Sequence, residues 1–426
     1  MSTPAAGARP RVRNGSSSNG GSTGRLSGLR LSSQPKPVRI LLLVLVALFV
    51  YALPLIEPPL ITTPDVDFAG VLFSVALYVL VALGLNIVVG YAGLLDLGYV
   101  GFYAVGAYTV AVLAKAHGSV PYLWTIPVAV ILAMVSGVVL GAPTLRVRGD
   151  YLAIVTLGFG EIVRLTAVNV DWLGGARGVS GVPGPPDVCK VEDATRCVEG
   201  YVAIPHLSWS TGQPLLDLNN TTKVLDFGVL DFVPYYWFAL TVIILVLWAD
   251  KRVKDSRVGR AWEATREDED AAELMGVPTF RFKLLAFALG AFVGGLSGAI
   301  YAGQEGFINP QSFLLLYSIL FLAAVVIGGQ GNRWGVIVGA IVVGYLPERF
   351  RGFQDWRVLV FGLALMILAV YRPQGLLPSR RTVRARQVER EVEEMGEDQE
   401  EPPGLAAGAL GASPDGPDDR QGGTRG

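Results

Sequence analysis

Apolar stretches of membrane-spanning length recur along most of this chain, and they limit the folds it can adopt. A helix needs about 20 mostly apolar residues to cross a bilayer. Its backbone N–H and C=O groups must pair inside the protein, because the lipid offers no water to replace them. The 426 residues are 51% hydrophobic and only 17% charged, so most of the chain must lie in lipid. We predict an all-α, polytopic bundle of transmembrane helices.

About ten segments have this character, several of them short or interrupted by glycine. They are residues 38–56, 68–89, 97–114, 122–140, 151–170, 232–248, 284–302, 313–328, 335–346 and 356–370. No small-residue cleavage site follows the first segment, so we interpret it as a retained span rather than a signal peptide. An even number of spans places both termini on the same side.

Lysine and arginine are concentrated in certain connections. With ten spans, these connections lie on the same side of the membrane as the N-terminus. The basic residues are Arg146 and Arg148, then Lys251, Arg252, Lys254, Arg257, Arg260 and Arg266, and finally Arg372, Arg380, Arg381, Arg384, Arg386 and Arg390. Short connections rich in these residues remain in the cytoplasm. We therefore predict cytoplasmic N and C termini, a cytoplasmic connection over residues 250–282 and an external loop over residues 171–231.

The two ends of the chain differ in composition from its apolar middle. Residues 1–37 are rich in Gly, Ser, Pro and Arg and contain no acidic residue, whereas residues 379–426 are rich in Asp and Glu. Such segments cannot bury enough apolar surface to order themselves. We predict a disordered basic tail, a membrane domain over residues 38–378 and a disordered acidic tail.

The chain has two cysteines and two histidines, too few for a multi-ligand metal site or a haem pocket. We therefore expect no metal and no cofactor. Cys189 and Cys197 both fall in the predicted external loop, where an oxidising exterior permits a disulfide. Two unpaired thiols are the alternative.

Glycines are denser between Gly84 and Gly106 than helix packing requires, and the same stretch contains a carboxylate. Irregular backbone at membrane depth is tolerated only inside protein or beside a cavity. We predict a broken or re-entrant helix here. Its polar and glycine positions are candidates for a translocation path: Asn86, Gly93, Asp96 and Gly98.

Glu161 and Arg164 lie inside a predicted span and one helical turn apart. Charges within the membrane mark functional sites by default, so both residues join the candidate path. Because residues at this spacing share a helix face, a purely structural ion pair is the alternative.

A charged, helix-prone stretch directly precedes the span over residues 284–302. It carries small or apolar positions among the charges, namely Ala261, Ala264, Ala271, Ala272, Leu274 and Met275. Gly276 and Pro278 then end the helix. Small residues permit close approach, so this helix could lie in a groove on a soluble partner. A solvated loop without a partner is the alternative.

Motifs typical of enzymes are missing from the sequence. We find no G-x-x-x-x-G-K-[ST] loop for ATP, no H-E-x-x-H and no G-x-S-x-G. We therefore expect a transport subunit without its own ATPase site.

Five stretches in order resemble the LivM-type permeases of branched-chain amino acid ABC importers. They are residues 84–109, 148–164, 174–185, 260–277 and 372–378, of which the last reads RPQGLLP. The fourth contains Asp-Ala-Ala-x-x-x-Gly, with Asp270 where the importer motif has Glu, and it lacks the motif's later Ile-x-Leu-Pro. The tails and residues 188–222 lie outside the resemblance.

The resemblance implies a multi-pass subunit of a bacterial plasma membrane importer. Its partners would be a LivH-like permease, two cytoplasmic ATP-binding subunits and an external substrate-binding protein, with no nucleic acid. Residues 260–276 would form the helix that couples to an ATPase, through Glu263, Asp270, Ala271, Ala272 and Gly276. The cargo would be branched-chain or other hydrophobic amino acids, with urea or short amides as the alternative.

A secondary transporter or channel is the competing class. Such a protein should carry more coupling carboxylates in its spans than Glu161 alone.

Overall fold

A computed structural model describes most of the apolar part of the chain. The described residues are 36–58, 62, 67–116, 120–146, 150–182, 184–185, 203–206, 217–223, 231–349, 359, 362–363, 366–367, 370–371 and 375–377. The chain divides into two units, residues 1–53 and residues 54–426. The first unit contains most of helix α1, and the second contains all the other elements.

Helices dominate the described residues. The α-helices are α1 (Lys36–Ile56), α2 (Phe68–Leu85), α3 (Tyr99–Ala116), α4 (Tyr122–Thr144), α5 (Asp150–Asn169), α6 (Phe232–Lys254), α7 (Arg257–Glu267), α8 (Glu269–Leu274), α9 (Thr279–Glu305), α10 (Leu315–Gly328) and α11 (Arg333–Arg349). A π-helix, η3 (Asn86–Tyr91), continues α2, and short 3₁₀ turns are η4 (Asp171–Leu173), η5 (Gly175–Arg177) and η7 (Pro310–Phe313). The helical class predicted from the sequence is confirmed.

Two small antiparallel sheets depart from a purely helical fold. Strand β1 (Val179–Ser180) pairs with β4 (Phe307–Ile308), and β2 (Ala203–His206) pairs with β3 (Asp217–Lys223). All but β4 come from the predicted external loop, and β4 directly follows the end of α9. Both sheets are two-stranded and lie in connections between the helices.

Six helical segments of the described residues are long and apolar enough to cross a membrane. They are Phe68–Tyr91, Tyr122–Thr144, Tyr151–Asn169, Phe232–Lys254, Thr279–Glu305 and Pro310–Gly328, and Val44–Ile56 and Tyr99–Ala114 are shorter apolar helices. Each predicted span coincides with a helix of the structure except the last, residues 356–370, which lies almost entirely outside the described residues. The number of ten spans remains a prediction.

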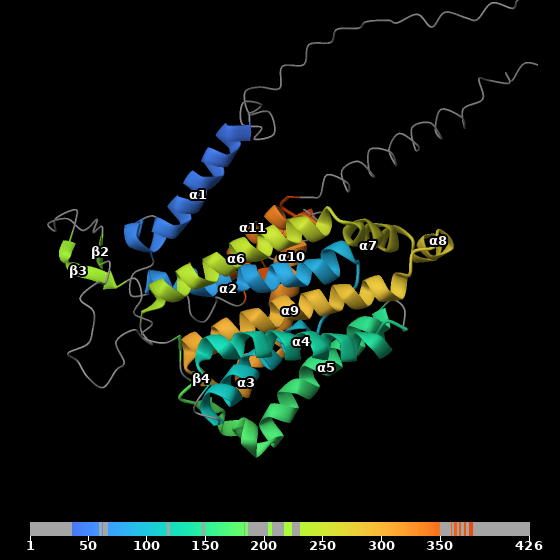
Figure 1. Ribbon diagram of the computed structural model, residues 1–426, viewed down its shortest axis with the longest axis horizontal. Helices are drawn as coiled ribbons and strands as arrows, with labels where there is room; N and C mark the ends of the chain where they lie inside the picture. The colour runs from blue at the N-terminus through green and yellow to red at the C-terminus, as the bar shows by residue number, and fades with distance from the viewer. Residues whose placement is uncertain are drawn as a thin grey trace, which may run out of the picture. The chain divides into compact units, whose positions relative to one another are not determined.

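Helix α9 is the centre of the second unit and packs against α3, α4 and α2 (Figure 1). Glycines allow this contact: a Cβ on Gly298 would collide with the Tyr103 carbonyl of α3, and one on Gly106 would collide with the backbone of Gly295. These glycines therefore serve close packing within the bundle. Gly339 and Gly328 form a similar contact between α11 and α10.

The helix break predicted between Gly84 and Gly106 is present. Helix α2 passes into η3, residues 92–98 are not helical, and α3 begins at Tyr99. Gly90 contacts α7 near the start of α9, whereas the Tyr99 hydroxyl donates to the Gly290 carbonyl, well inside α9, at 2.7 Å. Residues 92–98 thus lead from one end of the unit back into its interior.

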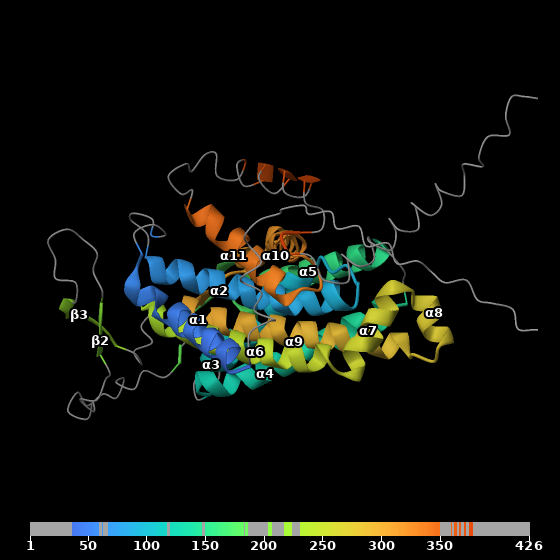
Figure 2. The ribbon, with the colours of Figure 1, turned by 90° about the horizontal axis from the view of Figure 1, so that it is seen from above.

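The two ends of the second unit carry different elements. Helices α7 and α8 lie at one end, on the right of Figures 1 and 2, and we call this the α7 end. The sheet β1–β4 lies at the opposite end, which we call the β4 end (Figure 1). Helices α2, α6 and α9 run between these ends side by side.

Candidate functional site

The polar segment before α9 forms two helices, α7 and α8, rather than the single helix expected from the sequence. Asp268 separates them: it has extended backbone, with φ −154° and ψ 112°, and its side chain accepts from the Ala271 N–H. An aspartate that caps the next helix cannot itself continue the previous one. Gly276, at φ +82°, then ends α8 as predicted.

Both helices are anchored on the beginning of α9. Trp262 of α7 is fully buried and its Nε1 donates to the Phe282 carbonyl at 2.6 Å. Lys283 of α9 forms an ion pair with Glu269, at the first turn of α8. A force applied to α8 would therefore be passed on to α9 rather than absorbed by a loose connection.

The outward surface of α8 is apolar at its tip. Leu274 is 87% exposed and Met275 is 85% exposed, and the side chains or backbone of Asp270, Ala271 and Gly276 are also exposed. Large apolar residues at such exposure mark surfaces that bind partners. We call Asp270, Ala271, Leu274, Met275 and Gly276 the α8 surface.

Ala272 differs from the rest of the predicted coupling residues. It is only 5% exposed and faces this chain, where α8 packs against α9. Alanine fits there because a larger side chain would separate the two helices. Ala272 therefore supports the α8 surface from behind, and Glu263 lies half-buried on α7.

Arg266 connects α7 to the helix break. Its guanidinium donates to the Gly90 carbonyl at the end of η3, and its aliphatic stem covers Gly93. Gly93 has φ +72°, and a Cβ there would lie 2.7 Å from the Arg266 Cγ. Burial lowers the pKa of Arg266 from its usual value. From the sequence, Arg266 was noted only as one of the basic residues in the connection over residues 250–282. No local sequence pattern indicates its contact with Gly90, because the two residues are far apart in the chain.

Asn86 ties the same region to the turn between α10 and α11. Its Oδ1 accepts from the Gly331 N–H at 2.9 Å, and Lys254 Nζ donates to the Gly331 carbonyl at 2.7 Å. Lys254 also lies over the ring of Tyr91, 4.7 Å from its centroid. Three distant segments, η3, the end of α6 and the α10–α11 turn, are thereby joined.

Asp250 is a buried carboxylate that sequence reasoning missed, because it lies just beyond the predicted span over residues 232–248. It accepts from the Tyr91 hydroxyl at 3.0 Å and pairs with Arg333 at 3.5 Å. Together with Arg266, Lys254 and Asn86 it forms a polar cluster around Gly90 and Tyr91, which we call the break junction.

Asp96 lies on the non-helical side of the break and is fully buried. Its Oδ1 accepts from the Gly98 N–H at 2.9 Å, close to the first turn of α3. Beside it, the Leu97 N–H donates to Thr156 Oγ1 of α5 at 3.1 Å, and a Cβ on Gly98 would collide with the Thr156 carbonyl. Of the four break residues of the candidate path, Asn86, Asp96 and Gly98 are buried, whereas Gly93 is exposed.

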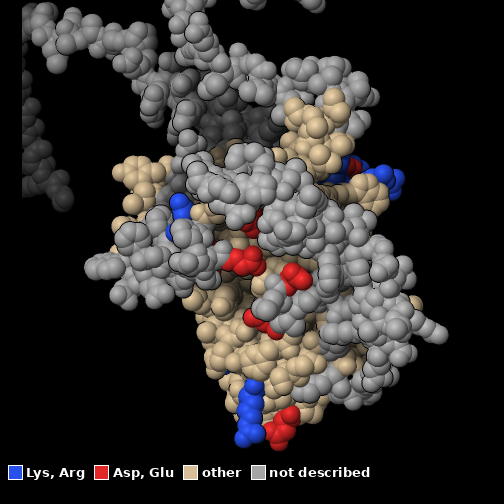
Figure 3. Space-filling view, turned by 90° about the vertical axis from the view of Figure 1, so that its left-hand side faces the viewer, with Lys and Arg blue, Asp and Glu red and all other residues tan. Residues whose placement is uncertain are grey.

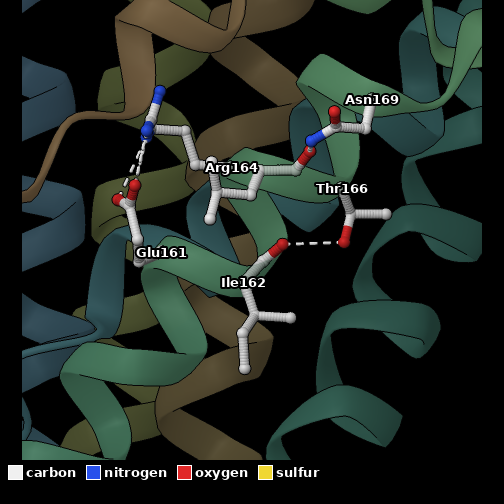
Figure 4. A network of polar contacts seen from close by, with 6 residues as sticks. Glu161, Ile162, Arg164, Thr166 and Asn169 are labelled. Carbon is white, nitrogen blue, oxygen red and sulfur yellow. Dashed lines mark hydrogen bonds and ion pairs between the residues drawn. The ribbon is translucent and has the colours of Figure 1, made fainter.

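Glu161 and Arg164 occupy another environment, on helix α5 (Figure 4). Arg164 Nε lies 3.0 Å from each carboxylate oxygen of Glu161. The Glu161 side chain is 40% exposed and that of Arg164 is 17% exposed. The two side chains bond to each other within α5. No hydrogen bond of the described residues joins the pair to the break junction, and its role, functional or structural, stays a prediction.

Some of the sequence predictions fall outside the described residues. These are Cys189, Cys197 and both tails. Of the RPQGLLP stretch, residues 375–377 are described: the Leu376 N–H donates to the Ile327 carbonyl at 2.6 Å, and Asn332 Nδ2 donates to the Leu377 carbonyl at 2.9 Å. Within the described part of the chain, no group of three or more His, Cys, Asp or Glu residues could hold a metal ion.

Residues 68–370 match the family model described as branched-chain amino acid transport system, permease component. The chain is 40% identical over 342 residues to the high-affinity branched-chain amino acid transport system permease protein LivM of Escherichia coli, covering 80% of this chain and 75% of that protein. A probable LivM of Methanocaldococcus jannaschii is 23% identical over 73% of this chain and 93% of its own length.

The corresponding LivH of Salmonella typhimurium is 32% identical over 128 residues, which cover 29% of this chain and 41% of that protein. No solved structure matches the chain. The family match covers the helices from α2 to α11. The chain therefore belongs to the family of permease components of branched-chain amino acid transport systems.

Proposed function

We propose that this permease subunit imports branched-chain or other hydrophobic amino acids. It receives them from an external binding protein and releases them into the cytoplasm, and separate ATP-binding subunits drive the cycle. The α8 surface is the observation that carries this proposal, because it presents Leu274 and Met275 to a partner while α8 itself is anchored on a membrane helix.

The distribution of charge supports an orientation with the α7 end in the cytoplasm. Lys251, Arg252, Arg257 and Arg260 are exposed where α6 ends and α7 begins. Basic residues next to spans remain on the cytoplasmic side. An ATPase that docks on the α8 surface would then lie in the compartment that contains ATP.

The break junction supplies a route from the docked ATPase to the translocation path. Closure of the ATP-binding subunits would move α8 and the beginning of α9, which Lys283 pairs with Glu269 of α8. Helix α7 would follow, because Trp262 donates to the Phe282 carbonyl of α9. Arg266 would carry this displacement to Gly90, and so to the backbone between η3 and α3. A broken helix can change its backbone angles at the break, which allows the bundle to alternate between two states.

A second permease completes the proposed assembly. The partial match to LivH supports a partner built on a related stretch of sequence. Helices α4 and α5 expose apolar residues such as Ile131, Val139 and Ile154, so either lipid or the partner can cover them.

The test is purification of the tagged chain from its native membrane in mild detergent, followed by reconstitution into proteoliposomes. We expect an ATPase and a second permease to copurify, and ATP-dependent uptake of labelled leucine that excess urea does not inhibit. Transport without ATP by the chain alone would overturn the proposal in favour of a secondary carrier or channel. Uptake of urea instead of leucine would show that the proposed substrate is wrong and would support the urea alternative.

A variant pair tests the α8 surface within this assembly. Leu274→Gln with Met275→Gln should lower ATPase copurification about tenfold, because two exposed apolar contacts are lost on the partner. Trp172→Gln is the control, since Trp172 is 70% exposed at the opposite end. Equal copurification from both variants would refute docking at the α8 surface while leaving the family assignment intact.

A further inference from the structure

A partly open pocket, lined largely by aromatic rings, lies between α2, α3, α9 and α10. Its volume is about 130 Å³, and Tyr78, Tyr103, Tyr301, Tyr317 and Phe321 contribute to its lining. A single water molecule requires roughly 10–15 Å³ of such space. The cavity, which we call the tyrosine pocket, is therefore large enough for part of a small organic molecule.

The rings of the tyrosine pocket are held in place by contacts with one another. Tyr103 lies 5.4 Å from Tyr301 and 6.1 Å from Phe321 between ring centroids, and Tyr78 lies 5.3 Å from Phe321. The rings come from four different helices and therefore line the space from several sides. Aromatic faces attract organic cations.

A second cavity of about 380 Å³ adjoins the tyrosine pocket, since both are lined by Ser74, Leu77 and Tyr301. It lies toward the β4 end and is lined by Asp67 at the start of α2, Glu305 at the end of α9 and Glu348 of α11. We call it the acidic vestibule. Figure 3 views this end and shows acidic side chains gathered near its middle.

The charge and the lining together restrict the chemistry of a ligand. Carboxylates at the entrance favour a cation and repel a free anion. They do not form a metal cluster within the described residues, so a divalent ion is a poor fit. Leu77 and Val81 add an apolar wall to the pocket. An ammonium group attached to an aliphatic chain matches all three features.

We propose that the acidic vestibule and the tyrosine pocket bind the ammonium group of the transported amino acid, with its aliphatic side chain against Leu77 and Val81. This inference rests on the proposed import of branched-chain amino acids, and it specifies where this subunit contacts the cargo. The vestibule attracts the ammonium group, and the ring faces then replace part of its hydration.

The test measures binding of radiolabelled 3-methylbutylamine, which is leucine without its carboxylate, to the assembled importer in lipid nanodiscs. We expect saturable binding that unlabelled leucine displaces. The acid 4-methylpentanoate, which is leucine without its ammonium group, should compete at least about tenfold more weakly.

Two pairs of variants locate the binding. Tyr78→Leu should weaken amine binding about tenfold by removing a ring face, whereas Tyr78→Phe retains the ring and the binding. Asp67→Asn combined with Glu305→Gln should weaken it similarly, and asparagine still caps α2 in place of Asp67. Asp171→Asn, a neutralisation of an exposed carboxylate on η4, should leave amine binding unchanged.

Assembly and ATP hydrolysis are measured for every variant, so that a folding defect is not mistaken for lost binding. Equal competition by the amine and the acid, or unchanged binding in both Tyr78→Leu and the vestibule variant, would overturn the site. Leucine uptake driven by ATP is recorded in parallel. Uptake without amine binding would reject only the pocket, whereas amine binding without any ATP-driven uptake would reject the proposed import.

Discussion

The helix break and the Glu161–Arg164 pair are both polar features within an apolar bundle, yet they differ in burial and in hydrogen-bond partners. Asn86 and Gly90 at the break are buried and bonded to distant segments, Asn86 to Gly331 and Gly90 to Arg266. Among the described residues, the side chains of Glu161 and Arg164 bond to each other on one helix, and Glu161 is 40% exposed (Figure 4). Polar residues within a membrane protein can therefore have two different structural roles.

Polar groups at the break connect different segments of the bundle, whereas the Glu161–Arg164 pair connects two residues of the same helix. A buried hydrogen bond between distant segments costs the full desolvation penalty when one partner is removed. An ion pair between residues one turn apart on the same helix joins no two helices and contributes only a few tenths of a kcal/mol to that helix. We therefore expect substitutions at the break to alter folding and coupling, and substitutions on α5 to have smaller effects.

The largest effect is expected for Gly98→Ala. The new Cβ would overlap the Thr156 carbonyl, which is backbone and cannot move aside, so the break would separate from α5. The free energy of unfolding should fall by roughly 3 kcal/mol. Thermal unfolding in detergent measures this, and Gly158→Ala on α5, whose Cβ would have nothing within 4 Å, is the matched control. Similar melting temperatures for the two variants would contradict the predicted packing of the break.

Arg266→Met should produce the next largest effect, on coupling rather than on folding. Methionine retains an apolar stem over Gly93 but cannot donate to the Gly90 carbonyl. We expect leucine uptake per ATP hydrolysed to fall about tenfold, as for the loss of a charged hydrogen bond. Arg266→Lys should restore part of it, and Arg260→Met, on an exposed position of α7, should have no effect. If uptake per ATP hydrolysed is unchanged in Arg266→Met, the contact between Arg266 and Gly90 does not couple α7 to the break.

A smaller effect is expected at Asp96. Asp96→Asn retains an oxygen that can accept from the Gly98 N–H, so the free energy of unfolding should change by less than about 1 kcal/mol. Asp96→Ala leaves that buried N–H unpaired and should cost about 1–2 kcal/mol. Chemical denaturation of the two variants in the same detergent gives the comparison. If both variants lose the same stability, the carboxylate charge matters more than the hydrogen bond.

The smallest effect is expected for Glu161→Gln. The pair is contained within α5 and joins no two helices, so its loss should change the stability of the isolated chain by less than about 1 kcal/mol. Melting temperature and uptake are measured on the same preparation. A normal melting temperature with reduced uptake would place Glu161 on the translocation path, whereas a normal value for both would leave it a structural pair.

Much of the fold could be predicted from local patterns. The apolar segments predicted the helices, and the glycine density around Asp96 predicted the break. Gly276 with Pro278 predicted the end of the polar helix. Each of these depends on neighbouring residues. The interruption at Asp268 was missed, although an aspartate before Glu269 and Asp270 is a typical helix start.

The break junction could not be predicted in the same way. Arg266 and Gly90 are far apart in the sequence, as are Asn86 and Gly331, and many arginines and asparagines in the chain look equivalent locally. The same limit explains Ala272, whose burial depends on how α8 settles on α9. The tyrosine pocket likewise combines residues of α2, α3, α9 and α10 that share no motif.

The sequence by itself determined that this chain is a helical membrane protein with a broken helix and a polar segment before α9. It did so because lipid requires internally paired backbone, and because apolar length and glycine content are local properties. Tertiary structure alone decided which polar groups meet and which surfaces remain open. Contacts such as Arg266 with Gly90 depend on how the helices pack, and packing is a property of the whole chain.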